Sequence, residues 1–276
     1  MTMIRLGVIW FVLVVMTSIS CASNDFLYES MKMVGGIRAM GMANVAVAVP
    51  RGASALFMNP AGLALKGAFL DYEMMDYDQL LHRRYDQFSM SMGSFGFGHI
   101  TREVSNGDNA TITYYGLARK GKGRVDWGVS YKRIDAQFGG VSVDTYSCDV
   151  GMVAYLSPRL KWGVVVQDFL KRDLDLEPTL ATGLAWNYES LLLAVDVVQH
   201  HLDNDSYLYA RYGMEYRVAD GLFVRVGNDR QFGMVGFTLT LPVLELDYAM
   251  KRVFNSDDEA TYYLGFRLGD KAWRNR

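Results

Sequence analysis

The sequence predicts an all-β fold, an antiparallel membrane-type β-barrel of about fourteen strands with an N-terminal hatch that contains a short helix. From residue 67 onward, the chain divides into short segments of alternating apolar and polar residues, separated by turn residues. Most segments are close to the roughly 9–11 residues that a tilted barrel strand needs. No stretch after residue 23 approaches a membrane-spanning helix, so a membrane location would require strands.

The first 22 residues are predicted to be a signal peptide. Arg5 is followed by an apolar run from Leu6 to Met16, and Ser20-Cys21-Ala22 has the small-x-small form of a cleavage site. The run is short for an anchoring helix, which needs roughly 20 residues. Cys21 also allows a lipoprotein interpretation, in which a new N-terminal cysteine is acylated, although Ser18 stands where Leu or Val is usual.

Residues 23–66 are predicted to form the hatch. The stretch 35–65 is rich in small residues and is interrupted by Pro50 and Pro60, so it is a poor strand. Residues 53–58 could form a short helix that ends at Asn59-Pro60, because a residue before proline avoids the α region. Small residues suit close backbone packing. The segment is therefore either a plug inside a barrel or a subdomain that covers one end of a sheet.

The barrel is predicted over residues 67–270, with a tail at 271–276. Pro158, Pro178 and Pro242 all fall at segment edges, where a missing N–H costs little. The predicted strands are 67–76, 83–92, 94–103, 110–120, 124–135, 141–156, 159–170, 179–188, 190–200, 206–218, 221–228, 231–241, 243–252 and 260–269.

The predicted connections alternate in length. Those after odd-numbered segments (77–82, 104–109, 136–140, 171–178, 201–205 and 253–259) are longer and polar, and those after even-numbered segments are short. Short periplasmic turns and longer outer loops are typical of outer-membrane barrels. The connection at Asp229-Arg230 breaks the trend.

The segments carry one apolar and one charged face. In 190–200, Leu191, Leu193 and Val195 share a face and Asp196 lies on the other, since side chains alternate along a strand. This pattern fits a barrel with lipid outside and charges inside. It also fits a soluble sandwich or propeller with its apolar face in the core.

The charges on the predicted inner face are of both signs. We expect most of them to pair with one another and with the hatch backbone, because buried charges need such partners; a permeation or ligand path is the alternative. Cys148 is expected on the lipid-facing side. The predicted lumen charges are Asp126, Lys132, Asp149, Asp196, Arg211, Glu215, Arg225, Glu245, Asp247 and Arg267.

Composition and motifs argue against catalysis and against nucleic acid. The 276 residues carry a net charge of −2, which does not indicate a nucleic-acid partner. The two cysteines give neither a disulfide framework nor a metal quartet, and the adjacent His200 and His201 point to opposite faces of a strand. Gly93 to Gly98 lacks the order of a nucleotide loop. We expect no enzyme activity, no metal and no cofactor.

The N-terminal motif carries a resemblance to a known family. It comprises Gly35-Gly36-x-Arg38, Gly41 and Asn59-Pro60-Ala61-Gly62. Matches continue in order along the chain at Asp149-x-Gly151, Gly213-x-Glu215-Tyr216, Arg225-x-Gly227 and Asp247-Tyr248-Ala249. The series resembles the PorV/PorQ outer-membrane proteins, which belong with the FadL-type long-chain fatty-acid transporters.

This resemblance implies fourteen strands, an outer-membrane location and a hatch site formed by the N-terminal motif. It implies a role in type IX-like protein secretion or surface attachment, with secretion proteins or exported clients as partners. Its FadL side implies passage of a small hydrophobic ligand instead. Outer-membrane lipid is the expected surrounding in both cases. A soluble periplasmic β-protein with a binding role is the third alternative.

Overall fold

The computed structural model describes residues 35–64, 67–76, 84–103, 109–138, 141–171, 178–202, 205–230, 232–253 and 260–269. The predicted signal peptide 1–22, the first part of the predicted hatch and the predicted tail 271–276 lie outside the described residues. Within the described chain, no helix is long and apolar enough to cross a membrane.

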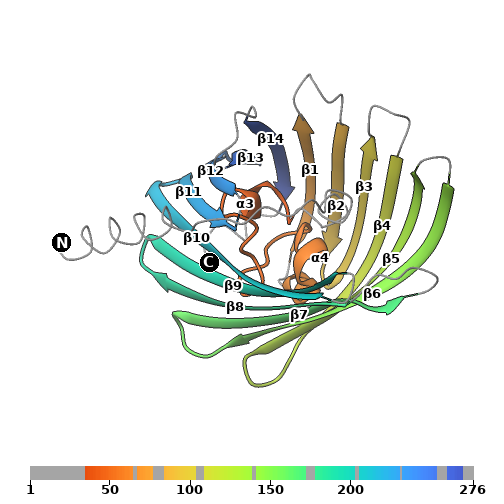
Figure 1. Cartoon of the computed structure of the whole chain (residues 1–276). Coiled ribbons are helices and arrows are strands. Elements are labelled where there is room, and N and C mark those ends of the chain that lie inside the picture. The colour runs from red at the N-terminus through yellow and green to blue at the C-terminus, as the bar shows by residue number, and fades with distance from the viewer. Residues whose placement is uncertain are drawn as a thin grey trace.

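Fourteen antiparallel strands form a closed barrel, which confirms the predicted fold class (Figure 1). Each strand pairs with its neighbours in the chain, and β14 closes the barrel on β1. The strands are β1 (Ala68–Asp76), β2 (Arg84–Met92), β3 (Phe95–Glu103), β4 (Asn109–Lys120), β5 (Val125–Phe138), β6 (Val141–Tyr155), β7 (Leu160–Lys171), β8 (Thr179–Tyr188), β9 (Leu191–Leu202), β10 (Asp205–Ala219), β11 (Leu222–Asp229), β12 (Phe232–Thr240), β13 (Leu244–Val253) and β14 (Thr261–Gly269).

The two ends of the barrel differ in their connections. At one end, here called the turn end, short turns such as 93–94 and 121–124 join the strands. At the other, the loop end, the connections 77–83, 172–178 and 254–260 are longer. Two of the predicted long connections are wrong. Strand β5 runs on to Phe138 opposite Val141, and β10 begins at Asp205 opposite Leu202, so each of these hairpins turns in two residues.

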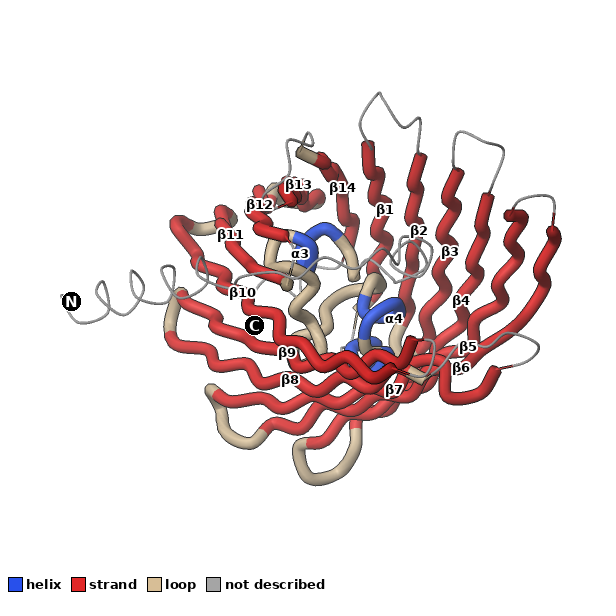
Figure 2. The backbone as a smooth tube through the Cα atoms, viewed as in Figure 1, coloured by secondary structure: helices blue, strands red, loops and turns tan. Residues whose placement is uncertain are grey.

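The barrel wall is taller on one side. Strands β4 to β7, β9 and β10 have 12–15 residues, whereas the other strands have 8–10. Figure 2 shows the long strands sweeping around one flank of the molecule. The extra length lies at the loop end of β5 and β6, where their ladder continues to the two-residue turn.

The hatch lies inside the barrel and forms its core. It contains the α-helices α3 (Ile37–Met40) and α4 (Ala55–Met58) and the 3-10 helix η1 (Pro60–Ala64), all within the ring of strands (Figures 1 and 2). Helix α4 lies within the predicted segment 53–58 and ends at Asn59, whose φ of −146° is extended. Pro60 then opens η1, a position that suits its fixed φ. The sequence did not predict α3 or η1.

Inward-facing glycines bring the wall close to the hatch. A Cβ atom on Gly128 would lie 2.4 Å from the carbonyl carbon of Pro60, and one on Gly163 would lie 2.1 Å from the Val47 oxygen. Any larger residue would therefore push the hatch backbone away. The glycines that face the hatch in this way form what we call the glycine belt: Gly96, Gly98, Gly116, Gly128, Gly151, Gly163, Gly213, Gly227, Gly236 and Gly265.

Candidate functional site: the plugged lumen

A buried ion-pair chain joins the hatch to the wall near the turn end. Helix α3 places Arg38 so that its Nε and Nη2 atoms lie 2.9 and 3.0 Å from the two Glu215 carboxylate oxygens. The Nε atom of Arg225 lies 2.6 Å from the same carboxylate. Arg225 also reaches Asp247, at 3.4 Å, and the Thr238 hydroxyl donates to that aspartate. One glutamate therefore bridges a hatch arginine and a wall arginine.

A second ion-pair chain spans the seam between the first and last strands. The Nε atom of Arg267 lies 2.6 Å from Asp71 Oδ1, and its Nη1 atom lies 3.1 Å from Glu245 Oε1. The other Asp71 oxygen accepts the Ser54 N–H of the hatch at 3.0 Å. The hatch is thus fastened to β1, and through Arg267 to β14 and β13.

Arg51 of the hatch carries its charge close to these two chains. Burial lowers the pKa of Arg51 to about 10, with the nearby Glu245 carboxylate opposing the shift and Arg38 and Arg267 adding to it. A pKa of about 10 still leaves the guanidinium charged at neutral pH. The turn end of the lumen is therefore a dense mixture of arginines and carboxylates.

Two further residues hold the hatch through its backbone. Asp196 Oδ2 on β9 accepts the N–H groups of Ala46 and Val47 at 2.9 and 3.1 Å. The Asn59 amide donates to the Val47 oxygen at 2.8 Å and to the Met152 oxygen of β6 at 3.2 Å. Such bonds replace the water that the hatch backbone loses inside the barrel.

Lys132 is the centre of a separate cluster, on the loop side of the hatch. Its Nζ atom lies 2.9 Å from both Asp149 and Asp168, and Ser130 donates to Asp149 at 3.2 Å. Asp168 lies in a bulge of β7, where residues 167–169 together face Asp149, and it has a φ of +60°. Because the bulge breaks the alternation of the strand, the sequence pattern did not reveal Asp168.

The remaining predicted lumen charges lie in separate contacts. Asp126 accepts the Tyr155 hydroxyl at 3.0 Å, and Arg211 pairs with Asp229 at 3.2 Å. The ten predicted lumen charges thus form several groups rather than one network. Asp71 was missed in the sequence, although it alternates with the outward-facing Leu70 and Tyr72 and so could have been found.

The predicted hatch residues occupy tight positions. Gly36 has a φ of +83°, and Gly35 donates its N–H to Asn44. Gly41 packs directly on Gly236, and a Cβ on Gly62 would lie 2.6 Å from Ala55. Ala61 donates its N–H to the Asn59 side chain at 3.1 Å, which closes the turn around Pro60.

The loop half of strands β2 to β5 carries apolar side chains on its inner face, with Gln87, Arg102 and Lys132 among them on the same face. The apolar ones are each at most 8% exposed and belong to one cluster with Leu56, Phe57 and Leu63 of the hatch. The Phe57 and Tyr114 rings meet edge to face, with centroids 5.0 Å apart. We call this surface the inner apolar wall: Tyr85, Ile100, Ala110, Ile112, Tyr114, Ile134 and Ala136.

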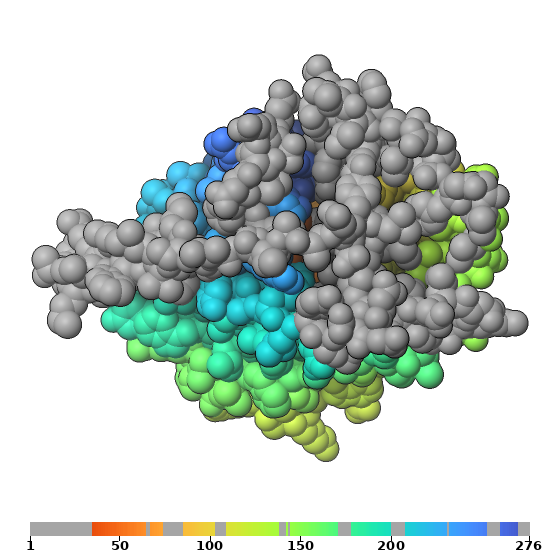
Figure 3. Space-filling view, viewed as in Figure 1, coloured from red at the N-terminus to blue at the C-terminus, as the bar shows by residue number. Residues whose placement is uncertain are grey.

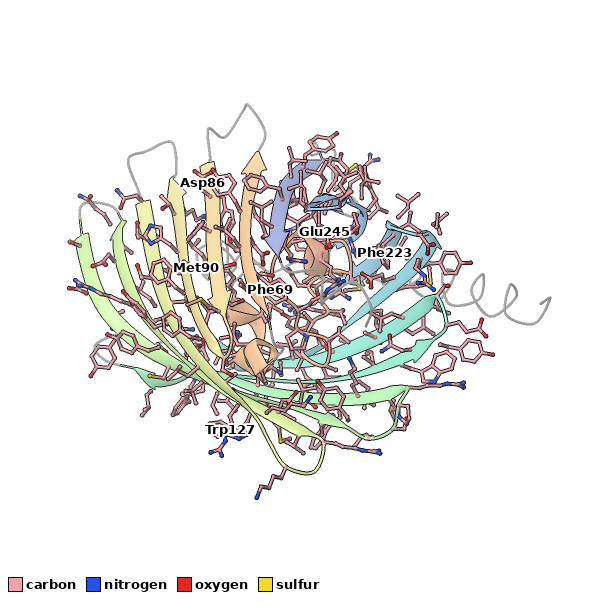
Figure 4. The ribbon with its side chains drawn as sticks, turned by 180° about the vertical axis from the view of Figure 1, so that it is seen from behind. Phe69, Asp86, Met90, Trp127, Phe223 and Glu245 are labelled. Carbon is pink, nitrogen blue, oxygen red and sulfur yellow. The ribbon has the colours of Figure 1, made fainter. Side chains whose placement is uncertain are left out.

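The outer face of the barrel carries a wide apolar surface. Exposed apolar side chains occur around the ring on both the long and the short strands, and Cys148 lies on this side, opposite Tyr131. Figure 4 shows side chains projecting outward all around the wall, with Met90 and Trp127 labelled. We call this surface the outer belt; it includes Met90, Phe95, Leu117, Val129, Val150, Leu184, Val224, Phe237, Leu264 and Phe266.

The outer belt ends partway up the long strands. On β5 and β6, the Tyr131 and Tyr146 rings stack at 5.9 Å, and the next outward pair is the exposed Arg133–Asp144 ion pair at 2.8 Å. The outer face of β2 to β5 near the loop end therefore turns polar where the inner face is apolar. Among the described residues, no group of His, Cys, Asp or Glu is arranged to hold a metal ion.

Several solved structures are similar to this chain. The CymD monoaromatic hydrocarbon channel and the Pseudomonas putida toluene transporter TodX each superpose with a TM-score of 0.61 at 11% identity, over 85% of this chain and 97% of theirs. A Pseudomonas aeruginosa FadL homologue gives a TM-score of 0.50 at 10% identity, over 83% and 97%. The chain has their fold.

These structures are hydrocarbon channels and a FadL homologue by their descriptions. They give no support to the PorV/PorQ side of the resemblance, on which the secretion role was based. No protein-family model matches the chain, and no curated protein matches it in sequence. At 10–11% identity, the structural likeness establishes the fold alone.

Proposed function

We propose that this chain is an outer-membrane channel for small hydrophobic molecules, and that the structure describes it with its hatch in place. The outer belt supports the membrane location. Monomeric soluble proteins rarely expose a contiguous apolar patch of more than a few hundred Å², and this belt runs around the barrel between aromatic residues such as Trp127, Trp162 and Tyr131.

The inner apolar wall is the observation that carries the transport function. A pore for water-soluble molecules has a polar interior, whereas Ile100, Ile112 and Ile134 form an apolar surface inside this barrel. The outer face of the same strands bears Thr113 and Arg133, which are polar side chains compatible with contact to water or lipid headgroups. An apolar molecule that reaches the lumen at this level therefore finds a surface that favours it.

The hatch sets a condition on this transport. Leu56, Phe57 and Leu63 pack directly against the inner apolar wall, so a passing molecule has to compete with these side chains. The channels named above, CymD and TodX, carry monoaromatic hydrocarbons and toluene according to their descriptions. A substrate of that size and polarity is the one we propose here. No contact in the described chain specifically favours a secretion role.

Uptake by living cells tests the proposal. The full chain would be expressed in a Gram-negative host that lacks its own channel of this type, and entry of a radiolabelled monoaromatic hydrocarbon would be compared with entry of a sugar. We expect faster hydrocarbon entry. Replacing Ile100→Asn and Ile134→Asn together should slow it several-fold, because the inner apolar wall then carries two polar groups.

Val165→Asn is the matched control, since Val165 also faces inward but contacts Val47 outside the inner apolar wall. Every variant would first be checked for a folded barrel by its gel mobility before and after boiling. Hydrocarbon entry that is no faster than in cells without the protein, with the barrel folded in the outer membrane, would refute the channel. A change in the set of surface proteins instead would favour secretion.

A further inference from the structure

The turn between β4 and β5 gathers exposed positive charge at the turn end. Arg119, Lys120, Lys122 and Arg124 are all exposed, and none of them has an ion-pair partner among the described residues. The Gly121 N–H donates to the Val125 oxygen at 2.8 Å, which keeps the turn tight. We call these four residues the basic turn. It stands out at the lower edge of the molecule in Figure 3 and beside the Trp127 label in Figure 4.

The neighbouring turn extends the same charge. Arg159, between β6 and β7, lies over the Tyr188 ring at 5.0 Å, and Tyr188 stacks on Trp186 at 5.4 Å. The exposed carboxylate described in this sector is Glu189, and the only other one close by, Asp126, is buried against Tyr155. The turn end from β4 to β8 is therefore strongly cationic.

The basic turn begins at the edge of the outer belt. Arg119 pairs in register with Trp127, and Leu117 beside them is 58% exposed and apolar. A strand rises about 3.3 Å per residue, so Lys120, Lys122 and Arg124 lie within about 10 Å of the Trp127 level. Tryptophan sits at the headgroup level of a membrane. The cations are thus at headgroup depth and within about one Debye length of lipid phosphates.

We propose that the basic turn binds the phosphate groups of anionic phospholipids in the leaflet that surrounds the turn end. The proposal rests on the membrane location proposed above. An acidic protein would need a cationic surface clear of the bilayer, whereas Arg119 lies on the outer face beside exposed Leu117 and Trp127. Apolar side chains for the acyl chains next to cations for the headgroup fit one lipid molecule better than a protein surface. Such cations typically strengthen attraction to anionic membranes.

Fluorescence quenching in bilayers of defined composition tests this. The mature chain would be reconstituted into phosphatidylcholine vesicles containing either brominated phosphatidylglycerol or brominated phosphatidylcholine. The tryptophans at the turn end report the lipid beside them. At low salt, we expect the quenching to show that brominated phosphatidylglycerol binds beside these tryptophans at least about threefold more strongly than brominated phosphatidylcholine. The preference should fall as salt rises, and K120Q/K122Q/R124Q should abolish it.

The control variant R133Q/R217Q/R252Q removes three exposed cations that are scattered over the barrel, and it should keep the preference. Equal quenching by both lipids, or a preference unchanged in K120Q/K122Q/R124Q, would overturn the proposal. Loss of the preference on adding inorganic phosphate, but not on adding sodium chloride to the same ionic strength, would assign a free-phosphate site instead. A wild-type protein that ignores phosphatidylglycerol but binds polyglutamate through the basic turn would indicate an acidic protein partner. Failure of a folded barrel to enter vesicles would refute the membrane location itself.

Discussion

Glu215 lies between two guanidinium groups, Arg38 of the hatch and Arg225 of β11, and all three side chains are buried. Taking charges out of water costs several kcal/mol per ion, and here the cost is offset by short hydrogen bonds on both sides. Removing one member therefore leaves the others buried without compensation. The network stabilises the hatch only as a complete set.

Glu215→Gln should destabilise the folded protein by about 3–5 kcal/mol, because Arg38 and Arg225 then share a neutral amide. Urea unfolding of the refolded protein, followed by tryptophan fluorescence, measures this. Asp144→Asn is the control, since it breaks the exposed Arg133–Asp144 pair, and exposed pairs contribute little. If both variants lost a similar free energy of unfolding, the buried ion pairs would contribute no more to stability than the exposed pair.

Single residues show which parts of the lumen could be predicted from the sequence. Strand alternation placed Glu215, Arg225 and Asp247 on the inner face, but it could not give Arg38 as the partner of Glu215, because that contact joins residues 177 positions apart. Asp168 escaped prediction for another reason. Its bulge interrupts the two-residue period on which the prediction of faces depends.

At the scale of single elements, strand β5 contains the boundary of the outer belt. Val129 and Trp127 are exposed and apolar, whereas Arg133 and Gln137 on the same face are exposed and polar. The alternating pattern was enough to predict every strand. It did not show that the outer face of β5 changes from apolar to polar toward the loop end. The predicted strand ended at residue 135, and the change is recognised only when the outward side chains of β5 are compared with those of the paired strands.

Val129→Arg should destabilise the barrel in lipid by about 2–4 kcal/mol, because it puts a charge on the lipid-facing side near the middle of the belt. Gln137→Arg, on the same face of the same strand, should have little effect, since it lies beyond the Tyr131–Tyr146 pair. Refolding into vesicles at increasing urea measures both. Equal tolerance of the two arginines would argue against lipid at Val129.

For the whole molecule, the barrel and its hatch have separate sources of stability. Every strand is paired on both sides by backbone hydrogen bonds to other strands, so the ladder of the barrel is complete without a backbone bond to the hatch. Asn59 is one of the residues that join the two parts, through the Val47 and Met152 oxygens. The sequence predicted the barrel and a hatch, but not which wall residues hold the hatch, since these contacts join distant parts of the chain.

The double variant Asn59→Ala and Pro60→Ala should leave the barrel folded and loosen the hatch. Liposome swelling should then show faster entry of small sugars than with the wild type, because the lumen is less completely filled. Gel mobility before and after boiling reports the barrel. A double variant that no longer folds would place Asn59-Pro60 in the structural core and remove any gating role from it.

Asp71 takes part both in the pair of strands that closes the barrel and in holding the hatch. It stands on the first strand, its register partner Arg267 stands on the last, and its second oxygen takes a hydrogen bond from Ser54. A cylinder that closed on an empty interior would join the same two strands but leave that oxygen without its amide. One side chain therefore serves both the pairing of β1 with β14 and the seating of the N-terminal segment.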